Sequence, residues 1–223
     1  MTGSISQTIN SIQSKIPQNV QLIAITKQVG IEPMKEAYKT GIRDFGENRL
    51  QEALNKQDKL DLTDINWHFI GHIQKNKARK IIENFDWIHS VDSLALAKRL
   101  NRIAAELNRN PKVLLQVKVL PDPNKYGWKA GELIEDLPQL DKCDRLKITG
   151  LMTILPLGLS TEETSSAFQN TKKLASTIAD KKYPNLEMQE LSMGMSGDYQ
   201  QAIAAGATMI RLGRTIFGER QTA

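Results

Sequence analysis

Eight short segments of mainly apolar residues recur along the 223-residue chain, and each leads towards a segment of helical character. The first of them, residues 20–26, is apolar at odd and even positions alike, which is typical of a parallel strand buried on both faces. Strands that alternate with helices predict an α/β fold. The count of eight favours a single (β/α)8 TIM barrel over a doubly wound open sheet. The eight segments are residues 20–26, 42–46, 67–72, 87–91, 113–119 and 148–154, the run that leads into Ser192, and residues 209–212.

One domain over residues 1–223 accounts for this pattern, because no Pro-, Gly- or Ser-rich tract divides the chain. The length also fits the lower part of the range of such barrels. Ahead of the first strand, Ile5, Ile9, Ile12 and Ile16 recur at helical spacing. We therefore expect an additional N-terminal helix that packs one apolar stripe on the barrel.

Two glycine-containing turns with hydroxyl side chains follow the seventh and eighth segments. The first is residues 192–197, SMGMSG, and the second is residues 213–215, GRT. Turns at the carboxyl ends of neighbouring parallel strands offer backbone N–H groups and a helix N-terminus to an anion. The spacing matches neither a Walker A loop nor a GxGxxG motif. The sequence therefore predicts a phosphate site of the barrel type.

Two cationic residues narrow the choice of ligand. Arg211 lies within the apolar run 209–212, where a charge is costly unless it is paired or faces a ligand. Lys27 ends the first strand, which neighbours the eighth in a closed barrel. A desolvated lysine beside a cation has a lowered pKa and becomes a nucleophile towards an aldehyde. Pyridoxal 5′-phosphate (PLP) combines an aldehyde with a phosphate, and a phosphorylated sugar or nucleotide intermediate is the alternative.

Composition excludes several other classes of function. The formal net charge is +5, but Lys and Arg alternate with Asp and Glu, and the basic run 75–80 is typical of a solvated helix face rather than a nucleic-acid site. Cys143 is the single cysteine, which favours a reducing cytoplasm. His68, His72 and His89 lack a matching carboxylate or cysteine cluster, so we expect no metal site. No signal peptide, membrane span or heptad seam is evident, and we expect a cytoplasmic monomer.

Six motifs in chain order resemble the pyridoxal phosphate homeostasis protein family, which consists of single barrels similar to the alanine racemase N-terminal domain. They run from the first strand to the last, so the resemblance covers nearly the whole chain. The motifs are AITK at 24–27, FGENR at 45–49, HFIGHIQKNK at 68–77, GLMT at 150–153, LSMGMSGD at 191–198 and IRLGRTIFG at 210–218.

The resemblance implies a set of cofactor-binding residues. Lys27 is implied to hold PLP as a Schiff base, and Arg211 to lie at the pyridine nitrogen. Asn48 and Met152 are implied to line the pocket. The phosphate is implied to be held by Ser192, the backbone around Met193 and Gly194, and Gly213, Arg214 and Thr215. Lys118 departs from the polar uncharged residue that the family commonly has, and Lys125 matches a loop lysine of the family.

The resemblance and the chemistry together favour a non-catalytic protein. An arginine at the pyridine nitrogen disfavours its protonation and weakens the electron sink that PLP enzymes use. We expect the barrel to take up the whole chain and therefore expect no counterpart of the second domain that assists the related racemases. We therefore expect a protein that buffers PLP or delivers it to recipient apoenzymes, and so influences amino-acid and keto-acid balance. The alternatives are a PLP-dependent racemase or decarboxylase and a barrel enzyme on a phosphorylated small molecule.

Overall fold

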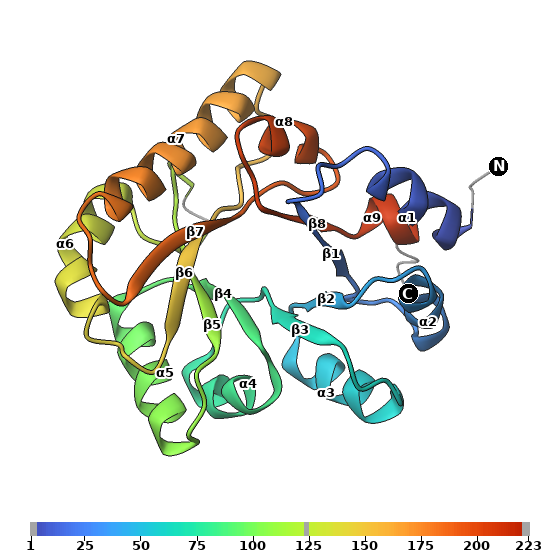
Figure 1. The fold of residues 1–223 in the computed structure, drawn as a ribbon, viewed down its shortest axis with the longest axis horizontal. Coiled ribbons are helices and arrows are strands. Elements are labelled where there is room, and N and C mark those ends of the chain that lie inside the picture. Colours follow the sequence, from blue (N-terminus) through green and yellow to red (C-terminus); the bar gives the residue numbers. More distant parts are fainter. Residues whose placement is uncertain (1–3, 123–124, 220–223) are drawn as a thin grey trace.

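The computed structural model, which describes residues 4–122 and 125–219, has its strands arranged around a central axis with the helices outside them (Figure 1). The described strands form one closed barrel in the order β1 to β8, and each pairs in parallel with its neighbours. This confirms the predicted barrel and is incompatible with an open sheet. The strands are β1 (Gln21–Ile25), β2 (Asp44–Glu47), β3 (Asn66–Phe69), β4 (Trp87–Val91), β5 (Lys112–Gln116), β6 (Lys147–Met152), β7 (Leu186–Ser192) and β8 (Met209–Leu212).

Helices connect the strands and cover the outside of the barrel (Figure 1). The expected N-terminal helix is confirmed as α1, which packs against α2 and α9 beside the first and last strands. The described part of the chain contains no helix long and apolar enough to cross a membrane. The helices are α1 (Ile5–Gln13), α2 (Ile31–Lys39), α3 (Leu50–Lys59), α4 (Ala78–Asn84) after the 3-10 turn η1 (Lys75–Lys77), α5 (Leu94–Glu106), α6 (Ala130–Leu140), α7 (Thr161–Ala179), α8 (Tyr199–Ala204) and α9 (Arg214–Phe217).

Most predicted strand ends lie within two residues of the observed ones, but the third and fifth strands end three residues earlier than predicted, at Phe69 and Gln116. The predicted end of the fifth strand at residue 119 is wrong, because the chain beyond Gln116 pairs with the loop before α6: Trp128 N donates to Gln116 O at 3.0 Å, and Lys118 N donates to Trp128 O at 2.8 Å. Strand β7 begins at Leu186, well before the predicted run, and between its buried ends it carries Glu187, Gln189 and Glu190, which are exposed or half-buried. An apolar run therefore marks only the buried carboxyl end of that strand.

The strands alternate between an outer and an inner face, as successive side chains of a strand must. On β1, Leu22 and Ala24 face the layer between the barrel and its helices, whereas Ile23 and Ile25 face the barrel interior. The interior contains an apolar cluster of Ile23, Ile25, Trp87, Leu114, Met152 and Met209. Burial of such side chains contributes about 1.5–3 kcal/mol each. The remaining interior positions include polar residues, and these form the site.

Candidate functional site

Arg211 on β8 is the cation of the barrel interior, and only 3% of its surface is exposed. Its Nη1 donates to Ser192 Oγ at 2.6 Å, and its Nη2 donates to the carbonyl oxygen of Thr153 at 2.8 Å. Both acceptors lie at the carboxyl ends of their strands, β7 and β6. Burial lowers the pKa of Arg211 to about 10, although the charge of Asp198 opposes the shift, so the guanidinium remains charged at neutral pH. The sequence predicts that the charge of Arg211 needs a partner or faces a ligand. In the structure its hydrogen-bond partners are two neutral acceptors, Ser192 Oγ and the carbonyl oxygen of Thr153.

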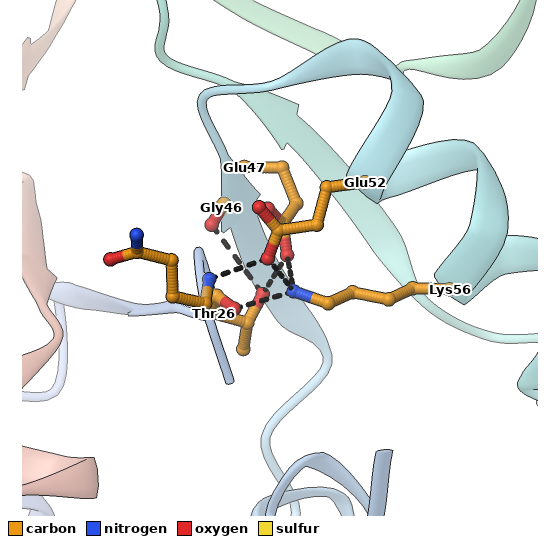
Figure 2. A network of polar contacts seen from close by, with 6 residues as sticks. Thr26, Gly46, Glu47, Glu52 and Lys56 are labelled. Atoms are coloured by element: carbon orange, nitrogen blue, oxygen red, sulfur yellow. Dashed lines mark hydrogen bonds and ion pairs between the residues drawn. The ribbon is translucent and has the colours of Figure 1, made fainter. Parts of the chain in front are cut away.

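Lys27 lies just beyond β1, at the carboxyl end of the barrel, and is partly buried. Both of its chain neighbours are held in place by residues of β2 and α3 (Figure 2). Thr26 Oγ1 donates to Glu47 Oε1 at 2.6 Å. On the other side, Gln28 N donates to Glu52 Oε1 at 2.5 Å. Gln28 adopts the left-handed conformation, with φ of 61°, so this hydrogen bond fixes a backbone geometry that few non-glycine residues adopt.

Lys56 of α3 joins the two halves of this arrangement (Figure 2). Its Nζ donates to the carbonyl oxygen of Thr26 at 2.6 Å and lies 2.7 Å from Oε1 of both Glu47 and Glu52. Glu47 is fully buried, and burial raises the pKa of its carboxyl, while Lys56 and Thr26 act in the opposite direction. We call these residues, Thr26, Glu47, Glu52 and Lys56, the lysine clamp, because they hold the backbone on both sides of Lys27.

Sequence reasoning missed the lysine clamp. A signal was available, because Glu52 and Lys56 are spaced i, i+4 on a helix, which is the spacing of an ion pair. Glu47 lies within the motif at 45–49, but nothing in the sequence indicates that its side chain points away from the barrel interior towards α3.

The turn after β7 is fixed by Gly194. This residue has φ of +93°, and a Cβ there would lie 2.6 Å from Ala202 Cβ and 2.9 Å from Tyr199 Cα of α8. The carbonyl oxygen of Gly194 accepts a hydrogen bond from Arg211 N at 3.0 Å. Any side chain at this position would therefore displace α8 from the turn or move the turn itself.

The two predicted phosphate turns are joined to each other. Thr215 N, in the first turn of α9, donates to Ser196 Oγ at 3.2 Å. Gly213 is the N-cap residue of α9, so that end of the helix has no capping side chain of its own. The structure thus brings Gly194, Gly213 and Thr215 into one region at the carboxyl ends of β7 and β8.

The other predicted site residues have different surroundings. Asn48 follows β2 and is partly buried, and its Oδ1 has no hydrogen-bond partner within residues 4–122 and 125–219. Its backbone is packed against Gly71, where a Cβ would lie 2.2 Å from Asn48 O. Met152 is fully buried in the interior cluster. Met193 packs in the outer layer, so only its backbone faces the site, and Met193 N already donates to Met209 O at 3.1 Å.

Ser192 and Arg214, which are also predicted to hold the phosphate, bond other protein groups in the structure. Ser192 is fully buried inside the barrel, and its hydroxyl lies between Arg211 and His89. The side chain of Arg214 is 60% exposed and lies 3.7 Å from Glu219. Ser192 therefore forms a hydrogen bond with Arg211, whereas the side chain of Arg214 lies at the surface.

Two further lysines were singled out in the sequence. Lys118 and Lys125 are both partly exposed and belong to the loop between β5 and α6. Next to Lys125, the ring of Tyr126 stacks on His72 with centroids 3.7 Å apart. In the part of the chain that the structure describes, no cluster of His, Cys, Asp and Glu could hold a metal ion.

Comparison with known proteins identifies relatives along the whole chain. The family model described as "Alanine racemase, N-terminal domain" matches residues 2–221. A protein of Synechocystis sp. named pyridoxal phosphate homeostasis protein is 56% identical over 212 residues, which cover 95% of this chain and 96% of the relative. The Escherichia coli protein of the same name is 39% identical over 210 residues, covering 92% of this chain and 87% of the relative.

Solved structures agree with these matches. PipY of Synechococcus elongatus without PLP is 51% identical, with a TM-score of 0.93 over 96% of this chain and 100% of PipY. The structure of PipY with PLP bound is 50% identical, with a TM-score of 0.92 over the same shares of the two chains. Alanine racemase of Clostridium difficile has the same fold, with a TM-score of 0.81 at 18% identity, and the match covers 98% of this chain but 57% of that chain. The chain therefore belongs to the family of the alanine racemase N-terminal domain and, within it, to the pyridoxal phosphate homeostasis proteins.

Proposed function

We propose that this protein binds PLP at the carboxyl end of its barrel and serves PLP homeostasis. Lys27 would hold the aldehyde carbon covalently, and Arg211 would lie at the pyridine nitrogen. The observation that carries the proposal is the buried guanidinium of Arg211, which is 3% exposed and fixed by Ser192 and Thr153 inside the barrel whose rim bears Lys27. PLP-bound PipY, at 50% identity, supports the choice of ligand.

The chemistry of the described residues fits such a ligand. Asn48 Oδ1 is a buried acceptor without a hydrogen-bond partner among the described residues, and a buried polar atom of this kind is costly unless something else satisfies it. Gly194, Gly213 and Thr215 bring backbone groups and a hydroxyl to the ends of two neighbouring strands, where barrels bind phosphate. Ser192 would act on the ligand through Arg211 rather than by direct contact with the phosphate.

The proposed role is buffering or delivery rather than turnover. When bound, PLP supplies an electrophilic carbon and an electron-withdrawing ring. A cation beside the ring nitrogen disfavours its protonation and so weakens that withdrawal. Proton transfer at a substrate carbon also needs positioned acids and bases. Recipient apoenzymes, a monomeric state and a cytoplasmic location belong to this proposal, and the lone cysteine, Cys143, which is buried and free, agrees with a reducing compartment.

The first test is the visible absorption of the freshly purified protein, followed by reduction with borohydride and mapping of the modified peptide by mass spectrometry. We expect a yellow protein whose label maps to Lys27, and a colourless Lys27→Ala variant. A protein that neither absorbs in the visible nor takes up added PLP would overturn the proposal. Label on Lys125 or Lys118 instead of Lys27 would overturn the assignment of the binding lysine.

The second test separates a binding protein from an enzyme. The PLP-loaded protein is incubated with a panel of amino acids, and racemisation and decarboxylation are followed over many equivalents of substrate. We expect no sustained turnover, together with transfer of PLP to an added PLP-dependent apoenzyme. Sustained turnover that is lost in Lys27→Ala would overturn the non-catalytic role while leaving PLP binding intact.

A further inference from the structure

A continuous chain of hydrogen bonds crosses the barrel interior from Arg211 to Asp44. Ser192 Oγ lies 2.8 Å from His89 Nδ1, His89 Nε2 lies 2.9 Å from His68 Nδ1, and His68 Nε2 lies 3.0 Å from Asp44 Oδ1. His68, His89 and Ser192 are fully buried, whereas the Asp44 side chain is 16% exposed. The chain thus leads from the guanidinium to a carboxylate at the start of β2, the end of the barrel opposite Lys27.

With both imidazoles neutral, the Asp44 carboxylate fixes the direction of this chain, because an ionised carboxylate can only accept. At the other end, Arg211 can only donate, so Ser192 Oγ accepts from it, and the hydroxyl hydrogen of Ser192 remains for His89 Nδ1. A neutral His89 then donates from Nε2 to His68 Nδ1. A neutral His68 in turn donates from Nε2 to the Asp44 carboxylate. Every group has its partner with both imidazoles neutral and in the Nε2–H form.

The charges around the chain favour the same arrangement. Burial lowers the pKa of His68, and it lowers that of His89 well below its ordinary value, with the neighbouring His68 and Arg211 adding to the effect. Burial alone would raise the pKa of Asp44, but hydrogen bonds from His68, Gln21 and Asn66 hold it below its ordinary value. The charged groups that face the imidazoles are Asp44, Asp86, Lys112 and Arg211.

A protonated His89 is the competing arrangement. Its Nδ1 would then donate to Ser192 Oγ, which already accepts from Arg211. Two cations would share one neutral oxygen in the buried interior of the barrel, and such an uncompensated buried charge is strongly unfavourable. The neutral, one-directional chain avoids this arrangement, and burial, which lowers the pKa of His68, disfavours a charged His68 that would reverse the chain.

We propose that Ser192, His89 and His68 are positioning residues for Arg211, and that Asp44 is the remote carboxylate that orients the whole chain. The aligned dipoles run from the guanidinium to Asp44, so they stabilise the charge of Arg211 and hold its orientation without a carboxylate beside it. The effect of these residues on PLP rests on the proposed function, because it assumes that Arg211 faces the bound PLP ring. The residues act on the ligand through Arg211.

The direction of the chain has a readout that needs no cofactor. The protein has three histidines, so the ring nitrogens can be assigned by ¹⁵N NMR, with His72 as the reference. At pH 7 we expect His68 and His89 to be neutral, with a protonated Nε2 and an unprotonated Nδ1. A charged imidazole or an Nδ1–H form at either residue would overturn the inferred direction.

The effect on PLP is tested in Asp44→Asn, which keeps an oxygen that can accept from His68 but removes the charge. Asp64→Asn is the matched control, because Asp64 bonds Arg43 and Tyr38 at the surface and has no part in the chain. We expect Asp44→Asn to shift the absorption maximum of bound PLP and to raise its Kd about tenfold. The control should keep both values.

The remaining outcomes separate this inference from the proposed function. Ser192→Ala breaks the chain at the other end, so it provides a second test should Asp44→Asn fold poorly, and we expect the same spectral shift. A variant that is merely less stable would bind less PLP with an unchanged spectrum, and that result in both variants would overturn the positioning role. If the wild-type protein takes up no PLP, the proposed function fails, while the NMR measurement still decides the direction of the chain.

Discussion

The Nζ of Lys56 donates a hydrogen bond of 2.6 Å to the carbonyl oxygen of Thr26, the residue that precedes Lys27. One cation of α3 thus bonds the backbone beside the proposed binding lysine and also compensates the buried carboxylate of Glu47. A buried ion pair adds little to stability by itself, but removal of one partner leaves the other charge buried and unpaired. The lysine clamp therefore couples the stability of the barrel to the position of Lys27.

Lys56→Met tests this coupling. We expect the free energy of unfolding to fall by about 3–5 kcal/mol, because Glu47 is left uncompensated, as measured by urea denaturation. Lys59→Met is the matched control one turn later on α3, where the side chain is exposed, and should change stability by at most about 0.5 kcal/mol. Equal effects of the two substitutions would contradict the role of Lys56. Any Lys56→Met protein that folds should also bind PLP more weakly.

Much of the fold could be predicted because strand burial is encoded locally. Residues 20–26 are apolar on both faces, and the structure places β1 there between a filled interior and a helical layer. Arg211 was also recognisable, since a charge in an apolar strand stands out. Strand β7 was predicted only at its buried carboxyl end, because Glu187, Gln189 and Glu190 in its middle are exposed or half-buried and interrupt the apolar pattern.

The polar interior could not be predicted in the same way. His68 and His89 each looked unaccompanied in the sequence, yet they are partners of each other, 21 positions apart. His89 and Ser192 meet across 103 positions, through the closure of the barrel rather than through any local pattern. Spacing rules describe neighbours on one helix or strand, so contacts across a barrel interior escape them.

Gly194→Ala tests the turn after β7. The left-handed backbone is expected to cost about 1–3 kcal/mol with any other residue, and the overlap with Ala202 adds to this, so thermal unfolding should occur at a clearly lower temperature. Gly197→Ala is the control within the same turn, because a Cβ there meets nothing within 4 Å. We expect that control to be neutral or slightly stabilising. Comparable losses in both variants would contradict the special role of Gly194.

Ser196→Ala tests the link between the two turns. The substitution leaves Thr215 N without its acceptor, which frees the first turn of α9 from the turn after β7. Loss of one such hydrogen bond costs about 1 kcal/mol, so PLP should bind about fivefold more weakly in a fluorescence titration. Free pyridoxal, which has no phosphate, should bind the variant and the wild type equally. An equal loss for both ligands would show that Ser196 does not act through the phosphate turns.

The two buried imidazoles predict a pH dependence of stability. Their pKa values are lowered in the folded protein, whereas in the unfolded chain a histidine has an ordinary pKa of about 6.5. As the pH falls below about 6.5, the unfolded state takes up protons that the folded state refuses, so stability is lost by up to about 1.4 kcal/mol per pH unit for each histidine. Asp44, whose pKa is also lowered, extends the loss to more acidic pH, where the unfolded carboxyl becomes protonated.

Urea denaturation at pH 8, 7, 6 and 5 measures this slope. His89→Gln keeps a donor towards His68 and removes one of the two titrating groups, so the loss between pH 6.5 and 5 should be about half as steep. His72→Gln is the control, because that side chain is 41% exposed at the surface, and the full slope should remain. A wild-type protein whose stability is constant between pH 7 and 5 would mean that the imidazoles are protonated in the folded state, which the one-directional chain from Arg211 to Asp44 forbids.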